Sequence, residues 1–125
     1  MKSDRSPISK DLLEFYKQRY MSVLSQYTGD GRRSYGFEYE FLPVRAMAID
    51  DVAAVTRCLK DLGFHARDKD LYSEETGMRI DFEPGGQIEY CSPPLLPSEN
   101  ERFERLMALI TQTNREIKER AGIEY

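Results

Sequence analysis

Large apolar residues recur at helical spacing near the beginning of the chain. The segment starts at Ser6 or Ser9, either of which can cap a helix, and it continues to Tyr27. Glycine and polar residues at positions 28–31 then end it. We expect a first helix here. Its many tyrosines favour packing in a core or in a partner interface over a stacking platform.

Two further segments show helical spacing, one in the middle and one near the end of the chain. The shorter one begins at Asp50 or Asp51, which we expect to cap a helix whose inward face includes Val55. The longer one begins at Ser98, and Glu101 three residues later completes a capping-box pattern. The sequence therefore predicts three helices.

The segments between the helices alternate apolar and polar residues, which is typical of half-buried strands. Six runs are predicted as strands, at residues 35–44, 64–67, 71–73, 78–82, 87–91 and 123–125. We expect an α+β fold in which an antiparallel sheet carries helices packed on one face. The length of 125 residues fits a single domain that spans residues 1–125.

Glutamates alternate with large apolar residues in the run Gly36-Phe37-Glu38-Tyr39-Glu40-Phe41. In a strand, Glu38 and Glu40 point to one face while the aromatic residues point to the other. A single alternating pair of this kind is more often a solvated sheet face than a metal site. The interpretation therefore depends on whether a second acidic face accompanies it.

A predicted hairpin supplies that second acidic face. Pro84-Gly85-Gly86 suits a three-residue connection, so that Glu83 and Gln87 flank the turn as a pair. In that register the apolar face collects Ile80, Phe82, Ile88 and Tyr90, and the polar face collects Asp81, Glu83, Gln87 and Glu89. Two acidic faces in one sheet favour a site for a hard cation such as Mg²⁺, which prefers carboxylate oxygens and usually brings phosphates.

Composition and charge narrow the possible partners. The net charge of -4, with scattered Lys and Arg, gives no electrostatic footprint for nucleic acid. No run is long enough to span a bilayer, and no signal-peptide pattern is visible, so we expect no membrane association. Cys58 and Cys91 are far apart and do not form a disulfide framework, so we expect a reducing, cytoplasmic compartment.

Three residues with possible chemistry have plainer structural interpretations. Cys58 lies beside the apolar stripe of the second predicted helix and is expected to be a small core residue. Cys91 has no nearby His or Lys in sequence that favours a thiolate, so we expect a structural thiol. His65 has no partner at metal-ligand spacing and is expected to be a surface or capping residue rather than a catalytic one.

The order of these elements resembles the N-terminal part of the glutamate–cysteine ligases. The likeness is to the second family of these enzymes, found in plants and many bacteria, within the wider carboxylate–amine ligases. It rests on a Gly-x-Glu-x-Glu element at residues 36–40, then a helix, then a Glu-Pro-Gly-Gly-Gln-x-Glu element at residues 83–89, a connector and a long helix. It covers most of the chain. The resemblance implies a partial glutamine-synthetase-like fold, with an antiparallel sheet curved around a funnel.

The same resemblance implies an enzyme and a set of site residues. The activity would be that of an ATP- and Mg²⁺-dependent ligase that joins glutamate and cysteine into γ-glutamylcysteine, the first step of glutathione synthesis. The implied ligands of Mg²⁺ or Mn²⁺ are Glu38, Glu40 and Glu89. The implied substrate- and nucleotide-binding residues are Glu83, Gly85, Gly86, Gln87 and, as the nearest cation for a phosphate, Arg79.

The chain also departs from that family. Family members are several times longer, and the additional part carries further strands and the basic residues that hold phosphates. Cys91 and Ser92 stand where the family more often has Ser and Gly. We therefore expect a partial or truncated form that is inactive alone and that forms a homo-oligomer or joins a second polypeptide completing the sheet. The alternative is a non-catalytic metal- or amino-acid-binding module that self-associates through a sheet edge.

Overall fold

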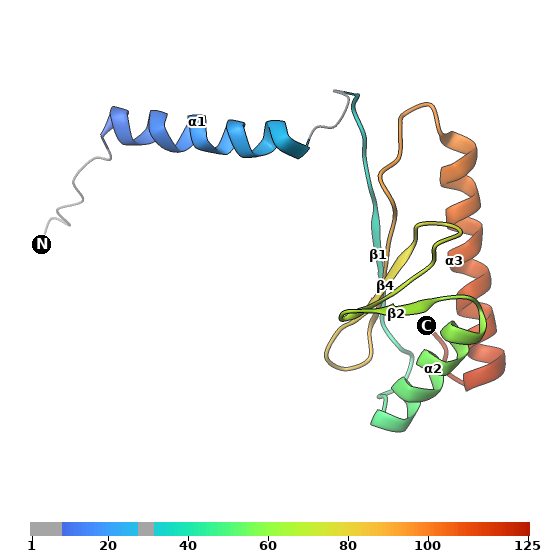
Figure 1. Cartoon of the computed structure of the whole chain (residues 1–125). Coiled ribbons are helices and arrows are strands. Elements are labelled where there is room, and N and C mark those ends of the chain that lie inside the picture. Colours follow the sequence, from blue (N-terminus) through green and yellow to red (C-terminus); the bar gives the residue numbers. More distant parts are fainter. Residues whose placement is uncertain (1–8, 28–31) are drawn as a thin grey trace, which may run out of the picture. The chain divides into compact units, whose positions relative to one another are not determined.

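The structure of the chain, a computed structural model, describes residues 9–27 and 32–125 (Figure 1). The predicted helix stop at residues 28–31 and the alternative helix start at Ser6 lie outside the described residues. The chain divides into two compact units, residues 1–33 and residues 34–125. Each unit is described by itself below.

The first unit contributes one helix, α1 (Lys10–Tyr27). The side-chain oxygen of Ser9 accepts a hydrogen bond from the backbone N–H of Leu12 at 3.2 Å, so the predicted cap at Ser9 is confirmed. Leu13, Tyr16 and Tyr20 are 54%, 60% and 65% exposed. Within the first unit these side chains are exposed, and their expected packing in a core or in a partner interface stays a prediction.

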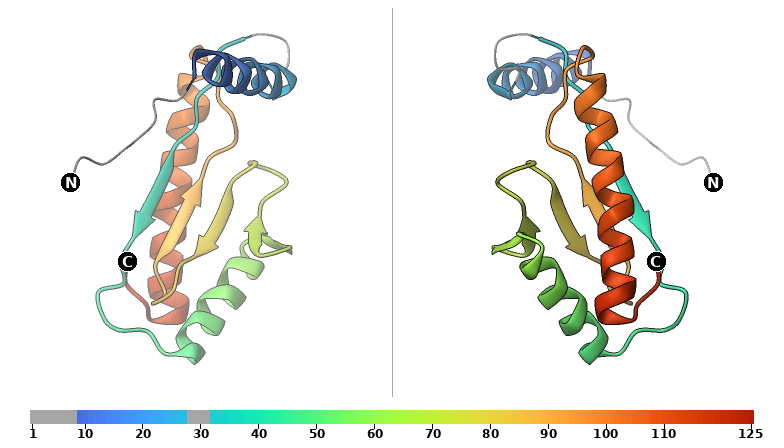
Figure 2. Two further views of the ribbon diagram at one scale, coloured as in Figure 1. Left: turned by 90° about the vertical axis from the view of Figure 1, so that its left-hand side faces the viewer. Right: turned by 90° about the vertical axis from the view of Figure 1, so that its right-hand side faces the viewer.

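The second unit is an antiparallel sheet with two helices. Its elements are β1 (Glu38–Phe41), α2 (Ile49–Asp61), β2 (His65–Arg67), β3 (Asp70–Tyr72), β4 (Arg79–Phe82), β5 (Ile88–Cys91) and α3 (Asn100–Ala121). The strand order is β1-β5-β4-β3-β2, and every neighbouring pair is antiparallel. Figure 2 shows α2 and α3 on the same side of this sheet. The predicted α+β class, with helices on one face, is confirmed. None of the helices in the described part of the chain combines the length and the apolar character needed to cross a membrane.

Two strand predictions need correction. The run 35–44 forms a strand only over Glu38–Phe41, and beyond it only Tyr35 makes an isolated bridge, to Leu95. The tail 123–125 is not a strand. The N–H of Val44, in the segment after β1, donates to the carbonyl of Glu124 at 2.9 Å, and Ile123 is fully buried in the core. The tail is therefore fixed by this bond and by side-chain packing rather than by a strand ladder.

The core lies between the apolar face of the sheet and the two helices. The predicted hairpin register is confirmed, with Ile80 opposite Tyr90 and Phe82 opposite Ile88. Ile80, Ile88 and Tyr90 are fully buried and pack with residues of α2 and α3 in one cluster. The hydroxyl of Tyr90 donates a hydrogen bond to the side-chain oxygen of Asn114 at 2.8 Å, which satisfies the one polar group that this ring carries inward. Burial raises the pKa of Tyr90 far above its usual range.

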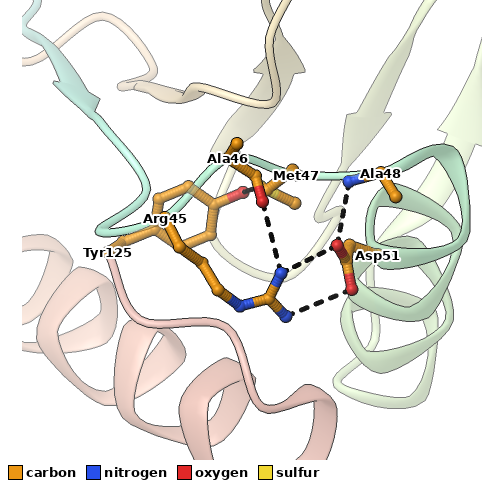
Figure 3. A network of polar contacts seen from close by, with 6 residues as sticks. All are labelled: Arg45, Ala46, Met47, Ala48, Asp51 and Tyr125. Carbon is orange, nitrogen blue, oxygen red and sulfur yellow. Dashed lines mark hydrogen bonds and ion pairs between the residues drawn. The ribbon is translucent and has the colours of Figure 1, made fainter.

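The start of α2 differs from the prediction that Asp50 or Asp51 caps it. Ala48 is the cap residue, with extended backbone, and both aspartates lie inside the helix. Asp51 reaches back so that its carboxylate accepts the N–H of Ala48 at 2.9 Å, and it also pairs with Arg45 at 3.0 Å (Figure 3). The hydrogen bond from Arg45 and that from Ala48 lower the pKa of Asp51. Asp51 therefore stabilises the N-terminus of α2 from the first turn of the helix rather than from the cap position.

The predicted capping box of α3 is also wrong. The cap residue is Glu99, and Ser98 lies before it in a turn closed by the N–H of Glu99 and the carbonyl of Leu96 at 2.9 Å. The carboxylate of Glu99 folds back to accept the N–H of Leu96 at 2.8 Å. This turn delays the helix start, so Ser98 does not meet Glu101 as a capping pair. The predicted stop after Ala121 is confirmed by Gly122, whose φ is 72°.

Candidate site on the polar face of the sheet

The polar face of the sheet brings the predicted acidic residues together. Across β1 and β5, Glu38 lies opposite Cys91 and Glu40 lies opposite Glu89. Residues directly opposite in an antiparallel pair share a face, so all four belong to the same surface. The sequence prediction that Glu38 and Glu89 share one face of one sheet is confirmed.

Three of these side chains form a group that could hold a metal ion. One carboxylate oxygen each of Glu38 and Glu89 and the sulfur of Cys91 all lie within 4.8 Å of one another. Among the described residues this group does not include Glu40. Glu40 faces Glu89 directly across the strands, where like charges repel. The metal role of Glu40 stays a prediction.

The donor set partly fits the implied cation. Two carboxylates suit Mg²⁺ or Mn²⁺, which complete their coordination with water and phosphate oxygens. Sulfur suits softer metals, so Cys91 is not a magnesium ligand. Glu38 and Glu89 are therefore the residues that would hold the ion.

Cys91 acts instead as a hydrogen-bonded neighbour of the acids. Its thiol donates to Glu89 Oε1 at 3.2 Å, and Arg79 Nη2 donates to its sulfur at 3.3 Å. Burial, followed by the hydrogen bond to Glu89, raises the pKa of Cys91 to about 11. Both cysteines are free and buried, as expected of structural thiols, and His65 is exposed, as predicted.

Arg79 is the centre of an ion-pair network on the same face. Its Nε lies 3.4 Å from Asp81 Oδ2 and 3.6 Å from Asp70 Oδ2. The other oxygen of Asp70 lies 3.7 Å from Nε of Arg67, and the Arg67 guanidinium stacks 4.1 Å from the ring centroid of Tyr72. Two arginines, Arg67 and Arg79, thus lie on the same face as the group of Glu38, Glu89 and Cys91, and both are paired with aspartates.

A cleft of about 810 Å³ opens over this part of the sheet. Side chains from all five strands line it, namely Glu38, Arg67, Tyr72, Arg79 and Cys91. Sequence reasoning identified Glu38 and Arg79 but missed Arg67 and Tyr72. The pairing of β2 with β3 was not predicted. It places Arg67 opposite Asp70, so the Arg67 side chain lies on the polar face of the sheet.

The predicted binding residues around the turn lie at the other end of the hairpin. Gly85 and Gly86 both have positive φ, 100° and 89°, and the N–H of Glu83 donates to the carbonyl of Gln87 at 2.9 Å. The predicted turn is confirmed. None of these four residues lines the cleft, so their substrate- or nucleotide-binding role stays a prediction.

The turn is held in place by contacts from outside the hairpin. The hydroxyl of Tyr125 donates to the carbonyl of Gly86 at 2.7 Å. The same oxygen lies 3.4 Å from Met47 Sδ, a contact drawn in Figure 3. Burial raises the pKa of Tyr125 to about 12. Gly86 is buried, and a Cβ there would lie 2.6 Å from the same sulfur of Met47. The second glycine is thus required by close packing as well as by its backbone angle.

Searches with this sequence and structure against protein-family models, curated proteins and solved structures give no match.

Proposed function

We propose that this chain carries the acidic metal-binding side of an ATP- and Mg²⁺-dependent carboxylate–amine ligase of the glutamate–cysteine type. The observation that supports the proposal best is the convergence of Glu38 and Glu89, from two strands far apart in sequence, on one group within 4.8 Å. The resemblance of both segments to that ligase family gives the reaction, in which ATP activates the γ-carboxylate of glutamate for attack by the amine of cysteine.

The residues of this chain would have distinct tasks in such a site. Glu38 and Glu89 would hold the cation, whose chemistry is to neutralise charge on the transferred phosphoryl group. Cys91, as a protonated donor to Glu89, would fix the orientation of that carboxylate. Arg79 would stand beside them, oriented by Asp70 and Asp81.

Phosphoryl transfer also needs several cations that grip the phosphates. On the polar face, Arg67 and Arg79 are the cationic residues of the cleft, and both are ion-paired. We therefore propose that the isolated chain does not make γ-glutamylcysteine, and that a second copy or a second polypeptide completes the site and the sheet.

The same ion pairs favour a second candidate function. Asp70 and Asp81 already neutralise much of the charge of Arg79, which suits a neutral or zwitterionic ligand better than a nucleotide. A non-catalytic module that binds a metal or an amino acid is consistent with this. Affinity for ATP in the presence of Mg²⁺ separates the two candidates, because only the ligase requires it.

Calorimetric titration with Mn²⁺ tests the metal site. We expect the wild-type chain to bind Mn²⁺, and Glu38→Ala combined with Glu89→Ala to abolish the binding. Glu104→Ala, at an exposed position of α3, is the matched control and should bind as the wild type does. Unchanged binding by the double variant would overturn the site.

Phosphate release and light scattering test the proposal that the isolated chain carries only part of the active site. With ATP, glutamate, cysteine and Mg²⁺ we expect no turnover by the chain alone, and a mass above that of one chain. Robust turnover by a monomer of 14.6 kDa would contradict the proposal.

A further inference from the structure

We propose that α1 of one copy of this chain docks on the second unit of another copy, where its apolar face covers the segment that joins β1 to α2. The proposal concerns how two copies associate, and it does not depend on the ligase reaction. It names the two surfaces that would meet, one on each unit of the chain.

The apolar face of α1 is a wide stripe of large side chains at helical spacing. These side chains are between 44% and 65% exposed, namely Leu12, Leu13, Tyr16, Tyr20 and Val23. A helix with such a stripe normally packs it against another element. Because the stripe is exposed within its own unit, the surface that covers it must come from outside that unit.

The charges of α1 are sorted by sign around this stripe. Lys17 and Arg19 each lie one helical turn from members of the stripe, on opposite edges of it. Neither cation takes part in an ion pair among the residues that the structure describes. Glu14 lies on the far side of the helix, where its carboxylate accepts a hydrogen bond from Gln18 at 3.3 Å. The stripe therefore suits a partner surface that is apolar and bordered by acids.

The two units of the chain carry opposite net charges. Residues 1–33 contain seven Lys and Arg against four Asp and Glu, a net charge of +3, and residues 34–125 contain 11 against 18, a net charge of -7. Attraction therefore favours α1 on the second unit of a copy over two α1 helices together, whose cationic edges would repel. The negative second unit also disfavours an anionic membrane as the partner.

The second unit exposes apolar side chains on the segment between β1 and α2. Leu42, Val44 and Ile49 are 68%, 70% and 89% exposed, more than any other large apolar side chain of the described residues. Asp50, next in sequence, is exposed and belongs to none of the ion pairs found in the described part of the chain. These four residues, the link patch, combine the apolar and acidic chemistry that suits α1.

The backbone of this segment is fixed from inside the unit. The N–H of Val44 donates to the carbonyl of Glu124 at 2.9 Å. Arg45, the cation of the segment, pairs with Asp51 at 3.0 Å (Figure 3). The link patch is therefore presented at a defined place, which lowers the entropy cost of docking.

The area of the contact is sufficient for a dimer. In a two-fold dimer the contact occurs twice, once for each α1. A stable interface buries roughly 1,200–2,000 Å² in total, so each contact needs to bury only roughly 600–1,000 Å². The five half-exposed side chains of the stripe and the three of the link patch supply an area of that order.

Light scattering of the full chain tests the two apolar surfaces. We expect the wild type to be a dimer, and Tyr16→Ser combined with Tyr20→Ser to weaken the dimer by roughly 100-fold or more. Leu42→Ser combined with Val44→Ser should have the same effect. Met21→Ser, at an exposed position of α1 outside the stripe, is the matched control and should leave the dimer unchanged. Circular dichroism confirms that each variant keeps its helices.

Charge reversal tests the edges of the stripe. Lys17→Glu combined with Arg19→Glu should weaken the dimer by roughly 10-fold at low salt, and the difference from the wild type should shrink as salt is added. Glu14→Lys, on the far side of α1, should not weaken it. A dimer that resists the reversal overturns the charge contact.

Disulfide trapping identifies which surfaces meet. Both natural cysteines are buried, so new exposed thiols can be oxidised selectively with diamide. We expect chains with Tyr20→Cys to crosslink to chains with Val44→Cys when the two are mixed. A crosslink between two Tyr20→Cys chains shows that the helices pair with each other, and a crosslink within one chain that carries both changes shows docking on its own second unit. Either result overturns the proposal.

The remaining outcomes separate this contact from the proposed function. A dimer that neither apolar double variant weakens overturns the α1 contact and leaves a second copy free to complete the sheet. A monomeric chain that binds vesicles of phosphatidylglycerol assigns the stripe to lipid and overturns the proposal, whereas Mn²⁺ titration still measures the metal site separately. A dimer that both double variants dissociate, in a chain that binds no Mn²⁺, supports the α1 contact and overturns the metal site.

Discussion

The two ends of the β4–β5 hairpin differ in their residues and in what surrounds them. At the turn, Gly86 is buried against Met47 and its carbonyl accepts the hydroxyl of Tyr125. At the opposite end, Arg79 and Cys91 line an open cleft. One end is closed by packing, and the other leaves polar groups facing solvent.

The Glu-Pro-Gly-Gly-Gln-x-Glu element therefore has two kinds of residue. Its glycines shape the turn, and its last glutamate, Glu89, belongs to the candidate metal site. The glycines of the Glu-Pro-Gly-Gly-Gln-x-Glu element set the hairpin register, because their positive φ allows a short connection. That register then places Glu89 beside Glu38 and Cys91. The glycines thus shape the candidate site from a distance, and changes at the two ends should have different consequences.

The largest effect is expected from Gly86→Val at the closed end. A β-branched residue must adopt a positive φ and must also displace Met47, whose sulfur lies 2.6 Å from the new Cβ. Together these should cost about 3 kcal/mol or more of unfolding free energy in urea denaturation.

Gly85→Val is the matched control, because it has the same backbone problem without the clash. Its Cβ would meet only the movable end of the Gln87 side chain, at 3.0 Å. We expect a loss of about 1–2 kcal/mol. If both variants lose the same free energy, packing against Met47 does not distinguish the two glycines.

A smaller effect is expected from Tyr125→Phe at the same end. The change leaves the carbonyl of Gly86 without its hydroxyl donor and should cost about 1 kcal/mol. Because the pKa of Tyr125 is raised to about 12, folding favours its protonated form. This contribution is complete below the ordinary tyrosine pKa of about 10 and is lost as the pH rises through 12. Denaturation at several alkaline pH values should show the wild type converging on the variant, and a constant gap would contradict the contact.

The smallest effect on stability, but a clear chemical one, is expected at the open end. With a pKa raised to about 11, Cys91 should be alkylated by iodoacetamide at pH 8 at least about 100-fold more slowly than an unfolded thiol, measured in a Cys58→Ala background. Glu89→Gln should speed the reaction, because it removes the negative charge that raises this pKa and replaces the carboxylate with a weaker, amide acceptor. A slower reaction in that variant would exclude the proposed hydrogen bond.

The β4–β5 hairpin could be predicted because its turn contains recognisable turn residues. The same reasoning failed for the β2–β3 hairpin, whose link contains none. Pro84-Gly85-Gly86 specifies a turn, so the pairing of β4 with β5 followed from sequence. The link between β2 and β3 has no glycine, and Asp68 adopts the positive φ of 51° instead, so Arg67 was not placed on the polar face.

The starts of α2 and α3 were missed for a related reason. Ala48 has no side-chain oxygen and gives no cap signal, because Asp51 supplies the oxygen from the first turn. In α3 the cap shifted to Glu99, whose carboxylate bonds to Leu96 in a turn that the sequence pattern does not reveal.

The strand order also has a consequence for how the chain folds. Strands β2 to β5 pair with their neighbours in sequence, whereas β1 pairs with β5 across the intervening helix and hairpins. Local pairs close short loops and form early, and a long-range pair costs more chain entropy and forms late. Because Glu38 belongs to β1, we expect the candidate site to be completed late in sheet assembly. Amide hydrogens of β1 should therefore exchange with solvent by local opening before those of β4, and each opening would disassemble the site without unfolding the core.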